Sequence, residues 1–547
     1  MDRIKKLVTI NNFTFLISTL FFFYMIYYFL TGSGGPLKLA TRLLPVCIIL
    51  FALYTIQKGK IYPKLGDKLN KAIALIYIAV AVVVLIYWEF HFEAITIYRA
   101  GSYTSWDILM GALMFIMVME ISRKIHTLLF WVNVALIIYT LYGYLSPIDF
   151  FWHPGTTLTR LVTSSTLELA TGVYGRYAQM ALTLIAAFLL MASVARAFGA
   201  QEAIINCAYA IFGRSKQNIP QVAVFSSATI GAVTGSSSAN VAVTGAFTIP
   251  LMVRHGFTPV YAGAVETSSS MGGLILPPLM AVAGFVMADF LGVPYWDVVI
   301  RAFSISFIYF AAIVLAVYLL SVRMIAPGKL KPPSVPMHDK LKTASFFASI
   351  LLLILLLGVF GIGPMRSAVY ASGLLFVLLG SIYVYYKYIK KDSTYVAESP
   401  VKIIRNIIET HADMTWYMVL LMSTMGIMIG LFTVTGFIIR MGALLMELGA
   451  VSIILTIFVA WVFGWIAGLG LPPTATYIVV AIIVVPPFVQ WGFNPWIGHW
   501  FAFMLSVWGE LSPPTSMTAA VAAKLAEAPF LKVMLEALKI CAPILIM

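Results

Sequence analysis

Charged residues are scarce in this sequence. Asp, Glu, Lys and Arg make up 10% of the 547 residues, whereas hydrophobic residues make up 61%. A soluble chain of this length needs far more charge to cover its surface, so the composition excludes a soluble globular protein. Runs of about twenty apolar residues recur from end to end, which predicts an all-α integral membrane protein, because a helix satisfies its own backbone hydrogen bonds in lipid.

Cysteine and metal-binding motifs are also scarce. The three cysteines lie in apolar segments without a CxxC spacing, which excludes a disulfide framework and gives no sign of a metal centre. The seven histidines form no HExxH motif, so a zinc enzyme has no support. We therefore expect no catalytic residues and no organic cofactor.

A basic surface for nucleic acid is missing despite the net charge of +14. Lys and Arg fall in short clusters between apolar runs, which is typical of the cytoplasmic loops of membrane proteins and not of a nucleic-acid interface. Arg3, Lys5 and Lys6 place the N-terminus in the cytoplasm. The sequence thus predicts a multi-pass protein of the cell (inner) membrane, with the bilayer as its surroundings and no nucleic-acid partner.

The first 150 residues resemble a separate module. They contain five predicted spans, near residues 10–30, 39–57, 71–88, 105–121 and 127–145. The first of these is too long and too closely followed by another span to be a cleaved signal peptide. A stretch rich in Pro, Gly and polar residues follows, which is typical of a junction. We therefore expect an N-terminal helical scaffold at residues 1–150 and a second module at residues 151–547.

The second module contains an internal repeat. The sequence GFTP at residues 256–259 returns as GFNP at residues 492–495, and 492 minus 256 is 236. The same offset relates GGLILPPL, from residue 272, to WGELSPPT, from residue 508. The copies are expected at about 199–325 and 436–547, and the chain stops inside an apolar run that the first copy continues, so the second copy is expected to be truncated.

Five predicted spans separate corresponding points of the two copies, near residues 258–290, 298–323, 343–361, 367–388 and 414–435. An odd number of spans inverts the second copy relative to the first. Inverted repeats with interrupted helices in corresponding positions indicate a secondary transporter whose site lies near the middle of the membrane.

Each copy is expected to contain a re-entrant helical hairpin with small hydroxyl residues at its tip, and a helix broken by Gly and Pro-Pro. Freed carbonyls together with Ser, Thr and Asn oxygens suit a hard cation such as Na⁺, and helix N-termini suit an anionic substrate. The candidate binding residues are Thr234, Ser236, Ser237, Ser238, Asn240, Gly272, Gly273, Gly470, Thr474, Thr476, Gly509, Glu510, Ser512 and Thr515. The helix breaks are expected at Pro277, Pro278, Pro513 and Pro514. Sodium ligands are expected among Ser238, Asn240, Gly273, Thr474, Thr476 and Gly509.

Two other interpretations stay open for parts of this set. Gly231 and Gly235 form a GxxxG pattern, which taken alone indicates close helix packing and not a ligand site. The duplication of polar tips and Pro-Pro breaks favours the ligand site instead. Glu510 replaces the Leu274 of the first copy; it is a protonatable carboxylate, a neighbour of the cation or a structural group bound to backbone amides. Glu266 and Asp289 have the same ambiguity.

Three stretches resemble a known family. They are YAGAVETSSSMGGLILPPLMAVAGFVMADFLGVPYWDV from residue 261, AGLGLPPTATYIV from residue 467 and WGELSPPTSMTAAVAAKLAEA from residue 508. They are similar to tripartite ATP-independent periplasmic (TRAP) transporters, in the form that fuses the small and large membrane subunits, often of the TAXI type. The resemblance covers about residues 150–547, whereas residues 1–150 match the small subunit only by position and number of spans.

The resemblance implies sodium-coupled uptake of an organic anion, such as a carboxylate, delivered by a separate TAXI-like extracytoplasmic binding protein. It also implies an elevator mechanism, in which the hairpins and broken helices move together. The first alternative is a stand-alone sodium/anion symporter, for which the five N-terminal spans are unexpected. A second, from another class, is an intramembrane enzyme that uses Glu510 and Glu266 as acid and base, although no nucleophile with a partner base is visible. A purely structural membrane scaffold is a third, but it does not need paired helix breaks.

Overall fold

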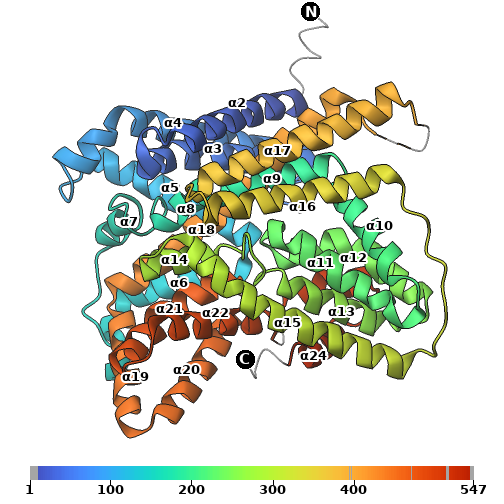
Figure 1. The fold of residues 1–547 in the computed structure, drawn as a ribbon. Coiled ribbons are helices and arrows are strands. Elements are labelled where there is room, and N and C mark those ends of the chain that lie inside the picture. Colours follow the sequence, from blue (N-terminus) through green and yellow to red (C-terminus); the bar gives the residue numbers. More distant parts are fainter. Residues whose placement is uncertain (1–9, 393–394, 396, 470, 513–515, 543–547) are drawn as a thin grey trace, which may run out of the picture. The chain divides into compact units, whose positions relative to one another are not determined.

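The computed structural model describes residues 10–392, 395, 397–469, 471–512 and 516–542. In this part of the chain every regular element is a helix (Figure 1). Ten of the described helices are long and apolar enough to cross a membrane. The prediction of an all-α membrane protein is therefore confirmed, while the direction in which each helix crosses stays a prediction.

The chain divides into two compact units. The first comprises Met1–Ser193 and Pro400–Met441, and the second comprises Val194–Ser399 and Gly442–Met547. The subunit boundary expected near residue 150 stays a prediction.

The first unit contains the N-terminal helices and one long later helix. Its helices are α2 Ile10–Thr31, α3 Gly35–Lys58, α4 Asp67–Glu93, η1 Ala94–Tyr98, α5 Ser105–Ile125, α6 Thr127–Tyr142, η2 Gly143–Leu145, η3 Asp149–Phe151, α7 Leu158–Thr166, α8 Arg176–Met180, η4 Ala181–Ile185, most of α9 Ala186–Ala197, and α18 Pro400–Val434. α3 packs against both α2 and α4, and the long α18 packs against α2, α3, α5 and α6 (Figure 1). The five predicted N-terminal spans thus correspond to α2, α3, α4 with η1, α5, and α6.

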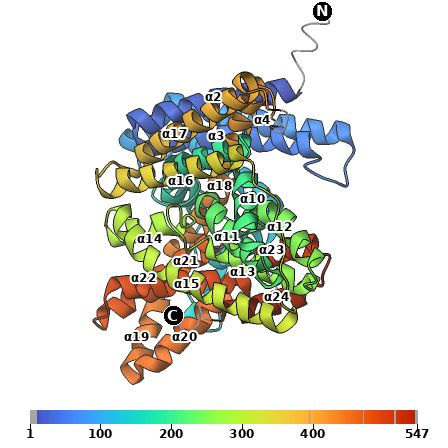
Figure 2. The same ribbon diagram turned by 45° about the vertical axis from the view of Figure 1, so that its right-hand side comes forward.

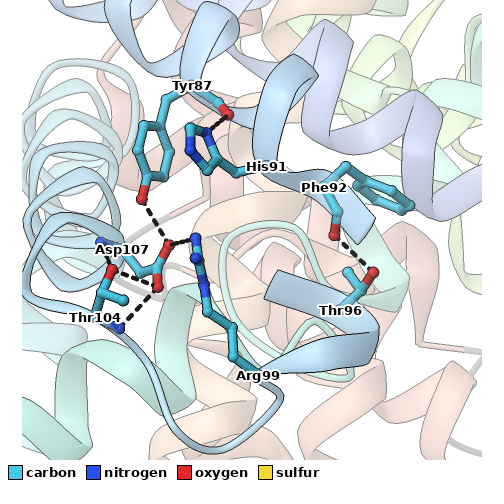
Figure 3. A network of polar contacts seen from close by, with 7 residues as sticks. All are labelled: Tyr87, His91, Phe92, Thr96, Arg99, Thr104 and Asp107. Atoms are coloured by element: carbon cyan, nitrogen blue, oxygen red, sulfur yellow. Dashed lines mark hydrogen bonds and ion pairs between the residues drawn. The ribbon is translucent and has the colours of Figure 1, made fainter. Parts of the chain in front are cut away.

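The turn between α4 and α5 is fixed by one buried carboxylate. Asp107, which is fully buried, accepts hydrogen bonds from the Tyr87 hydroxyl and from Arg99 at 2.7 Å each. Its other oxygen accepts from the backbone N–H and the hydroxyl of Thr104, the N-cap of α5. Figure 3 shows these groups pointing toward the same carboxylate from α4, the turn and α5. Because a buried charge is costly unless it is paired, this network holds the turn in one conformation.

The second unit contains the remaining helices. They are α10 Ala200–Phe212, η5 Lys216–Asn218, α11 Ile219–Thr234, α12 Ser237–Arg254, α13 Pro259–Gly272, α14 Ala283–Leu291, α15 Tyr295–Met324, α16 Met337–Gly358, α17 Pro364–Val384, η6 Tyr385–Ile389, α20 Ile453–Gly468, α21 Pro473–Gln490, α22 Pro495–Leu511, α23 Met517–Leu525 and α24 Phe530–Cys541. α19, Phe437–Val451, begins in the first unit and continues in the second. α11, α12 and α13 pack together, as do α20, α21 and α22 (Figures 1 and 2).

The internal repeat is visible in the helix bounds. α12 begins at Ser237 and ends at Arg254, and α21 begins and ends 236 residues later. The broken helices begin at Pro259 and Pro495, which are also 236 residues apart. The order of hairpin, broken helix and following helix is thus the same in both copies. That one copy is inverted in the membrane stays a prediction.

The repeated GFTP and GFNP sequences each make the same corner. Gly256 and Gly492 have φ angles of 97° and 87°, in the left-handed region that glycine adopts without strain. Thr258 and Asn494 then cap the next helix through their side-chain oxygens, and a proline follows at the first helical position. The motif therefore ends one helix and begins the next in each copy.

Candidate functional site

A pair of glycines joins the hairpin to the broken helix in each copy. A Cβ atom added to Gly231 of α11 would lie 2.8 Å from the Cα of Gly273, and one added to Gly468 of α20 would lie 2.5 Å from the Cα of Gly509. Only glycine allows the two backbones to approach so closely. Gly231 therefore does pack closely, and this packing brings the hairpin onto the helix break.

The first hairpin tip lies between α11 and α12. Gly235 has a φ of 62° and ends α11, and Ser236 caps α12 by accepting from the Ala239 N–H at 3.4 Å. Thr234 is buried and donates to the Gly231 carbonyl at 3.4 Å. Ser238 is half-buried, with its hydroxyl 3.4 Å from that of Ser236. The tip thus concentrates hydroxyl groups in an otherwise apolar segment.

The first helix break is held by hydrogen bonds from α15. Tyr295 donates to the Pro278 carbonyl at 2.6 Å, and Ser306 donates to the Ile275 carbonyl at 2.9 Å. The carbonyl of Gly272 accepts from the backbone N–H groups of the following turn, those of residues 275 and 276. Pro277 and Pro278 are both buried in this break. Several carbonyls that the break frees are therefore already bonded within the protein.

Asn240 connects the first tip to a buried carboxylate. Its side chain is fully buried, and its Nδ2 donates to the Ser227 carbonyl at 2.8 Å and to the Ser270 hydroxyl at 3.2 Å. The Ser270 hydroxyl donates in turn to Oε1 of Glu266 at 3.3 Å. The amide of Asn240 is thus fixed by groups from α11 and α13, and Glu266 lies two hydrogen bonds away from it.

Glu266 is enclosed by hydroxyl groups, which we call the hydroxyl cage. Its Oε1 accepts from Ser227 at 2.7 Å, from Thr244 and from Ser270, and its Oε2 accepts from Thr248. The glutamate is fully buried. Four donors satisfy a group that would otherwise be very costly to bury.

The second hairpin tip carries fewer hydroxyl contacts. Thr474 and Thr476 are buried at the start of α21. The Thr476 hydroxyl lies 3.5 Å from the Pro472 carbonyl, and the Thr476 methyl carbon faces Gly468. Gly470 lies outside the described residues.

The second helix break connects to the first hairpin tip through Glu510 and Thr518. Oε1 of Glu510 accepts from the backbone N–H of Thr518 at 3.2 Å and from its hydroxyl at 2.7 Å. The Thr518 hydroxyl also lies 2.7 Å from that of Ser237, at the first tip. Glu510 therefore does bond to a backbone amide of the broken helix, as the structural interpretation expects. Whether it has a further role stays a prediction.

The remaining candidates lie around this second break. Ser512 is buried and donates to the Trp508 carbonyl at 2.9 Å, while the Gly509 carbonyl accepts from the Ser512 N–H. Pro513, Pro514 and Thr515 lie outside the described residues. Asp289 is half-buried near the end of α14.

The chemistry of these oxygens suits a hard monovalent cation better than a transition metal. Among the described residues, no three His, Cys, Asp or Glu side chains come together in a way that could hold a metal ion. Hydroxyl, amide and carbonyl oxygens instead dominate both tips, and such ligands suit hard cations.

A cavity of about 860 Å³ lies beside the first break, between α11, α15 and α16. Its lining is almost entirely apolar and includes Phe225, Leu276, Pro277, Phe303, Phe307 and Phe310. Hydrocarbon fits these walls, whereas an anionic substrate does not.

The hydroxyl cage is the main feature that the sequence interpretation missed. Asn240, Thr244 and Thr248 repeat every four residues along α12, so they form a polar stripe on one face of an apolar helix. Ser270 lies four residues after Glu266 and faces the same side of α13. This spacing is a signal that could have been found from the sequence.

Comparison with known families decides the identity. The model of the family described as "Tripartite ATP-independent periplasmic transporter, DctM component" matches residues 112–547. The chain belongs to this family. The match begins within α5 and includes both copies of the internal repeat.

Individual relatives match shorter regions. The chain is 29% identical over 133 residues to the C4-dicarboxylate TRAP transporter large permease protein DctM of Rhodobacter capsulatus, which is 24% of this chain and 29% of that protein. It is 26% identical over 102 residues to the uncharacterized protein YgiK of Salmonella typhimurium, 19% of this chain and 23% of that protein. The chain thus spans less than a third of the length of these curated relatives. The crystal structure of the YdaH transporter of Alcanivorax borkumensis is 16% identical with a TM-score of 0.46, over 77% of this chain and 95% of that one.

Proposed function

We propose that this TRAP family member is a secondary active transporter of the inner membrane, with its N-terminus in the cytoplasm, that imports an organic anion together with Na⁺. The observation that carries the proposal is the repeated junction of hairpin tip and helix break, Gly231 on Gly273 and Gly468 on Gly509. Helix breaks at membrane depth are tolerated around a cavity or ligand, and paired breaks in repeated units are typical of transporter sites.

The proposed substrate is a carboxylate that a separate, TAXI-like extracytoplasmic binding protein delivers. Membership of the DctM component family supports a tripartite arrangement. The name of the Rhodobacter capsulatus relative makes C4-dicarboxylates the first compounds to test. In this proposal residues 1–150 act as the small subunit, fused to the large one, and the hairpins and broken helices move together as an elevator.

The proposed sodium sites include Asn240 at the first tip and Thr476 at the second. Both side chains are fully buried, and the first belongs to a hydrogen-bond network with Ser227 and Ser270. Oxygen ligands at both tips would allow cation binding to stabilise the closed arrangement of tip and break.

Thermal unfolding in sodium tests this proposal. The purified full-length protein is compared in NaCl and in choline chloride at equal ionic strength, beside Asn240→Ala and Thr476→Ala. A ligand that binds only the folded state stabilises it by RT ln(1 + [L]/Kd), so about a hundredfold excess of Na⁺ over Kd gives about 2.7 kcal/mol. Each substitution is expected to weaken the sodium-specific shift. Ser381→Ala, which changes an exposed hydroxyl on α17, is the matched control and should leave the shift unchanged.

Three results would each overturn part of the proposal. A wild-type protein that shows no sodium-specific shift at any concentration is not sodium-coupled, and proton coupling through Glu510 would then be tested. Uptake of a C4-dicarboxylate by proteoliposomes without any binding protein would favour the stand-alone symporter. Hydrolytic turnover that Glu510→Gln abolishes would favour the enzyme.

A further inference from the structure

The side-chain amide of Asn240 is oriented by its two hydrogen bonds. Its Nδ2 donates to the Ser227 carbonyl and to the Ser270 hydroxyl, at 2.8 and 3.2 Å. Its Oδ1 is buried and accepts no hydrogen bond from the described residues. A buried acceptor without a donor costs free energy, so its presence calls for an explanation such as a bound cation.

Ser270 fixes which end of the amide faces it. A serine hydroxyl has one hydrogen to donate and two lone pairs that accept. Ser270 donates this hydrogen to Oε1 of Glu266, one helical turn earlier on α13, at 3.3 Å. Its lone pairs are then left to accept, which favours the NH₂ end of Asn240 and disfavours the carbonyl end.

Glu266 is the acceptor at the end of this chain of hydrogen bonds. Its Oε1 accepts from Ser227, Thr244 and Ser270, and its Oε2 accepts from Thr248. Oε1 accepts from three hydroxyl groups and Oε2 from one, so the carboxylate is engaged mainly within the cage, and the ligand that we assign is the Asn240 oxygen. Its effect reaches the tip through the orientation of Ser270.

The second copy shows that the fold does not need the hydroxyl cage. The residues 236 positions after Ser227, Thr244, Thr248 and Glu266 are Phe463, Val480, Val484 and Ala502, and Ser270 alone keeps a hydroxyl counterpart, Ser506. The second copy nevertheless forms the same hairpin and the same glycine contact with its broken helix. A buried carboxylate and its donors are expensive to keep where apolar residues build the same structure, so the cage in the first copy serves something other than folding.

We propose that Glu266 is a positioning residue of a cation site at the first hairpin tip. Through Ser270 it holds the NH₂ group of Asn240 inward, which leaves Oδ1 as a fixed oxygen ligand. Without Ser270 as an acceptor the amide is held by the Ser227 carbonyl alone, so Oδ1 is less firmly fixed as a ligand. This inference rests on the proposed function, with Na⁺ as the cation, and assigns a role to a residue that is not itself a ligand.

Sodium titration of thermal unfolding tests this role, with NaCl replaced by choline chloride at constant ionic strength. Groups that orient a metal ligand commonly change affinity by about 10–100-fold when they are substituted, and we expect a change of this order in the half-saturating sodium concentration for Glu266→Gln and Ser270→Ala. We call the chain of hydrogen bonds from Glu266 through Ser270 to Asn240 the relay. The double variant should lose no more sodium affinity than the more severe single variant, because both substitutions break this one relay. Ser269→Ala is the matched control: it removes a buried hydroxyl of α13 that donates to the Val265 carbonyl and not to Glu266, and its half-saturating concentration should stay within about threefold of wild type.

The outcomes separate this inference from the proposed function. If the wild type responds to sodium and Glu266→Gln titrates like the wild type, the positioning role is wrong and the proposed function stands. Independent, multiplying losses in the double variant would also overturn the relay. If the wild type has no sodium response, both proposals fail together. Should Glu266→Gln not fold, which the unfolding temperature in choline reports, Ser270→Ala alone decides, since a wild-type titration in that variant overturns the relay.

Discussion

The two copies in the second unit have the same backbone plan and different polar interiors. In the first copy, α12 and α13 face each other across Thr244, Thr248 and Glu266, which are joined by hydrogen bonds. In the second copy, the equivalent helices α21 and α22 pair the Tyr477 hydroxyl with Nδ1 of His499 at 2.9 Å. The same helix pair is thus bonded by an acidic group in one copy and by a neutral pair in the other.

This difference distinguishes the features that both copies share, which build the fold, from the polar residues that only one copy has. The glycine contacts, the capped corners and the helix bounds recur in both copies, so they belong to the fold. Glu266 belongs to the first copy and Glu510 to the second, and neither has an acidic counterpart 236 residues away. Asymmetry of this kind is expected when two repeats bind different ligands, such as ions and parts of a substrate, within one site.

The glycine contacts should give the largest effects on stability. Gly231→Ala and Gly468→Ala each place a Cβ against the backbone of the broken helix, at 2.8 and 2.5 Å, and backbone cannot move aside cheaply. Overpacking of this kind costs about 1–3 kcal/mol, and we expect the upper part of that range for both variants. Thermal unfolding of the purified protein measures the loss. Gly380→Ala in α17 is the control, because no atom lies within 4 Å of its added Cβ. A loss in one copy alone would break the equivalence of the two junctions.

The link between the second break and the first tip should give an intermediate effect. Thr518→Val removes the hydroxyl that lies between Glu510 and Ser237, and leaves the buried carboxylate with the backbone N–H of residue 518 as its remaining described donor. The expected loss is about 1–2 kcal/mol, because a buried acceptor loses a partner. Thr267→Val is the control, since among the described residues that buried hydroxyl bonds back to the Gly263 carbonyl of its own helix and to no other helix. Equal losses in the two variants would mean that the link does not stabilise the fold.

The sequence was sufficient for the helices and the repeat but not for the contacts between them. The polar first tip, the break at Pro277 and Pro278 and the offset of 236 are local or periodic features, and each predicts an element that the described residues contain. The pairing of Ser237 with Thr518 joins residues 281 positions apart, and no local pattern predicts it. Gly468 was missed because its role depends on Gly509 across a helix interface, and only the packed structure shows that neighbour.

The neutral pair of the second copy should give the smallest effect. Tyr477→Phe keeps the ring and its edge contact with Phe503, whose centroid is 5.9 Å away, and removes the hydroxyl that lies near His499. The loss of one such hydrogen bond costs about 0.5–1.5 kcal/mol, and we expect the lower part of that range, because a neutral imidazole left without a partner is less costly to bury than a carboxylate. Thermal unfolding measures this loss, with Tyr370→Phe at an exposed position of α17 as the control. The sodium titration should not change, since the pair lies outside the relay from Glu266 to Asn240. A shifted sodium titration in Tyr477→Phe would instead mean that the second copy also orients the cation site. The comparison that assigns this role to the first copy would then be wrong.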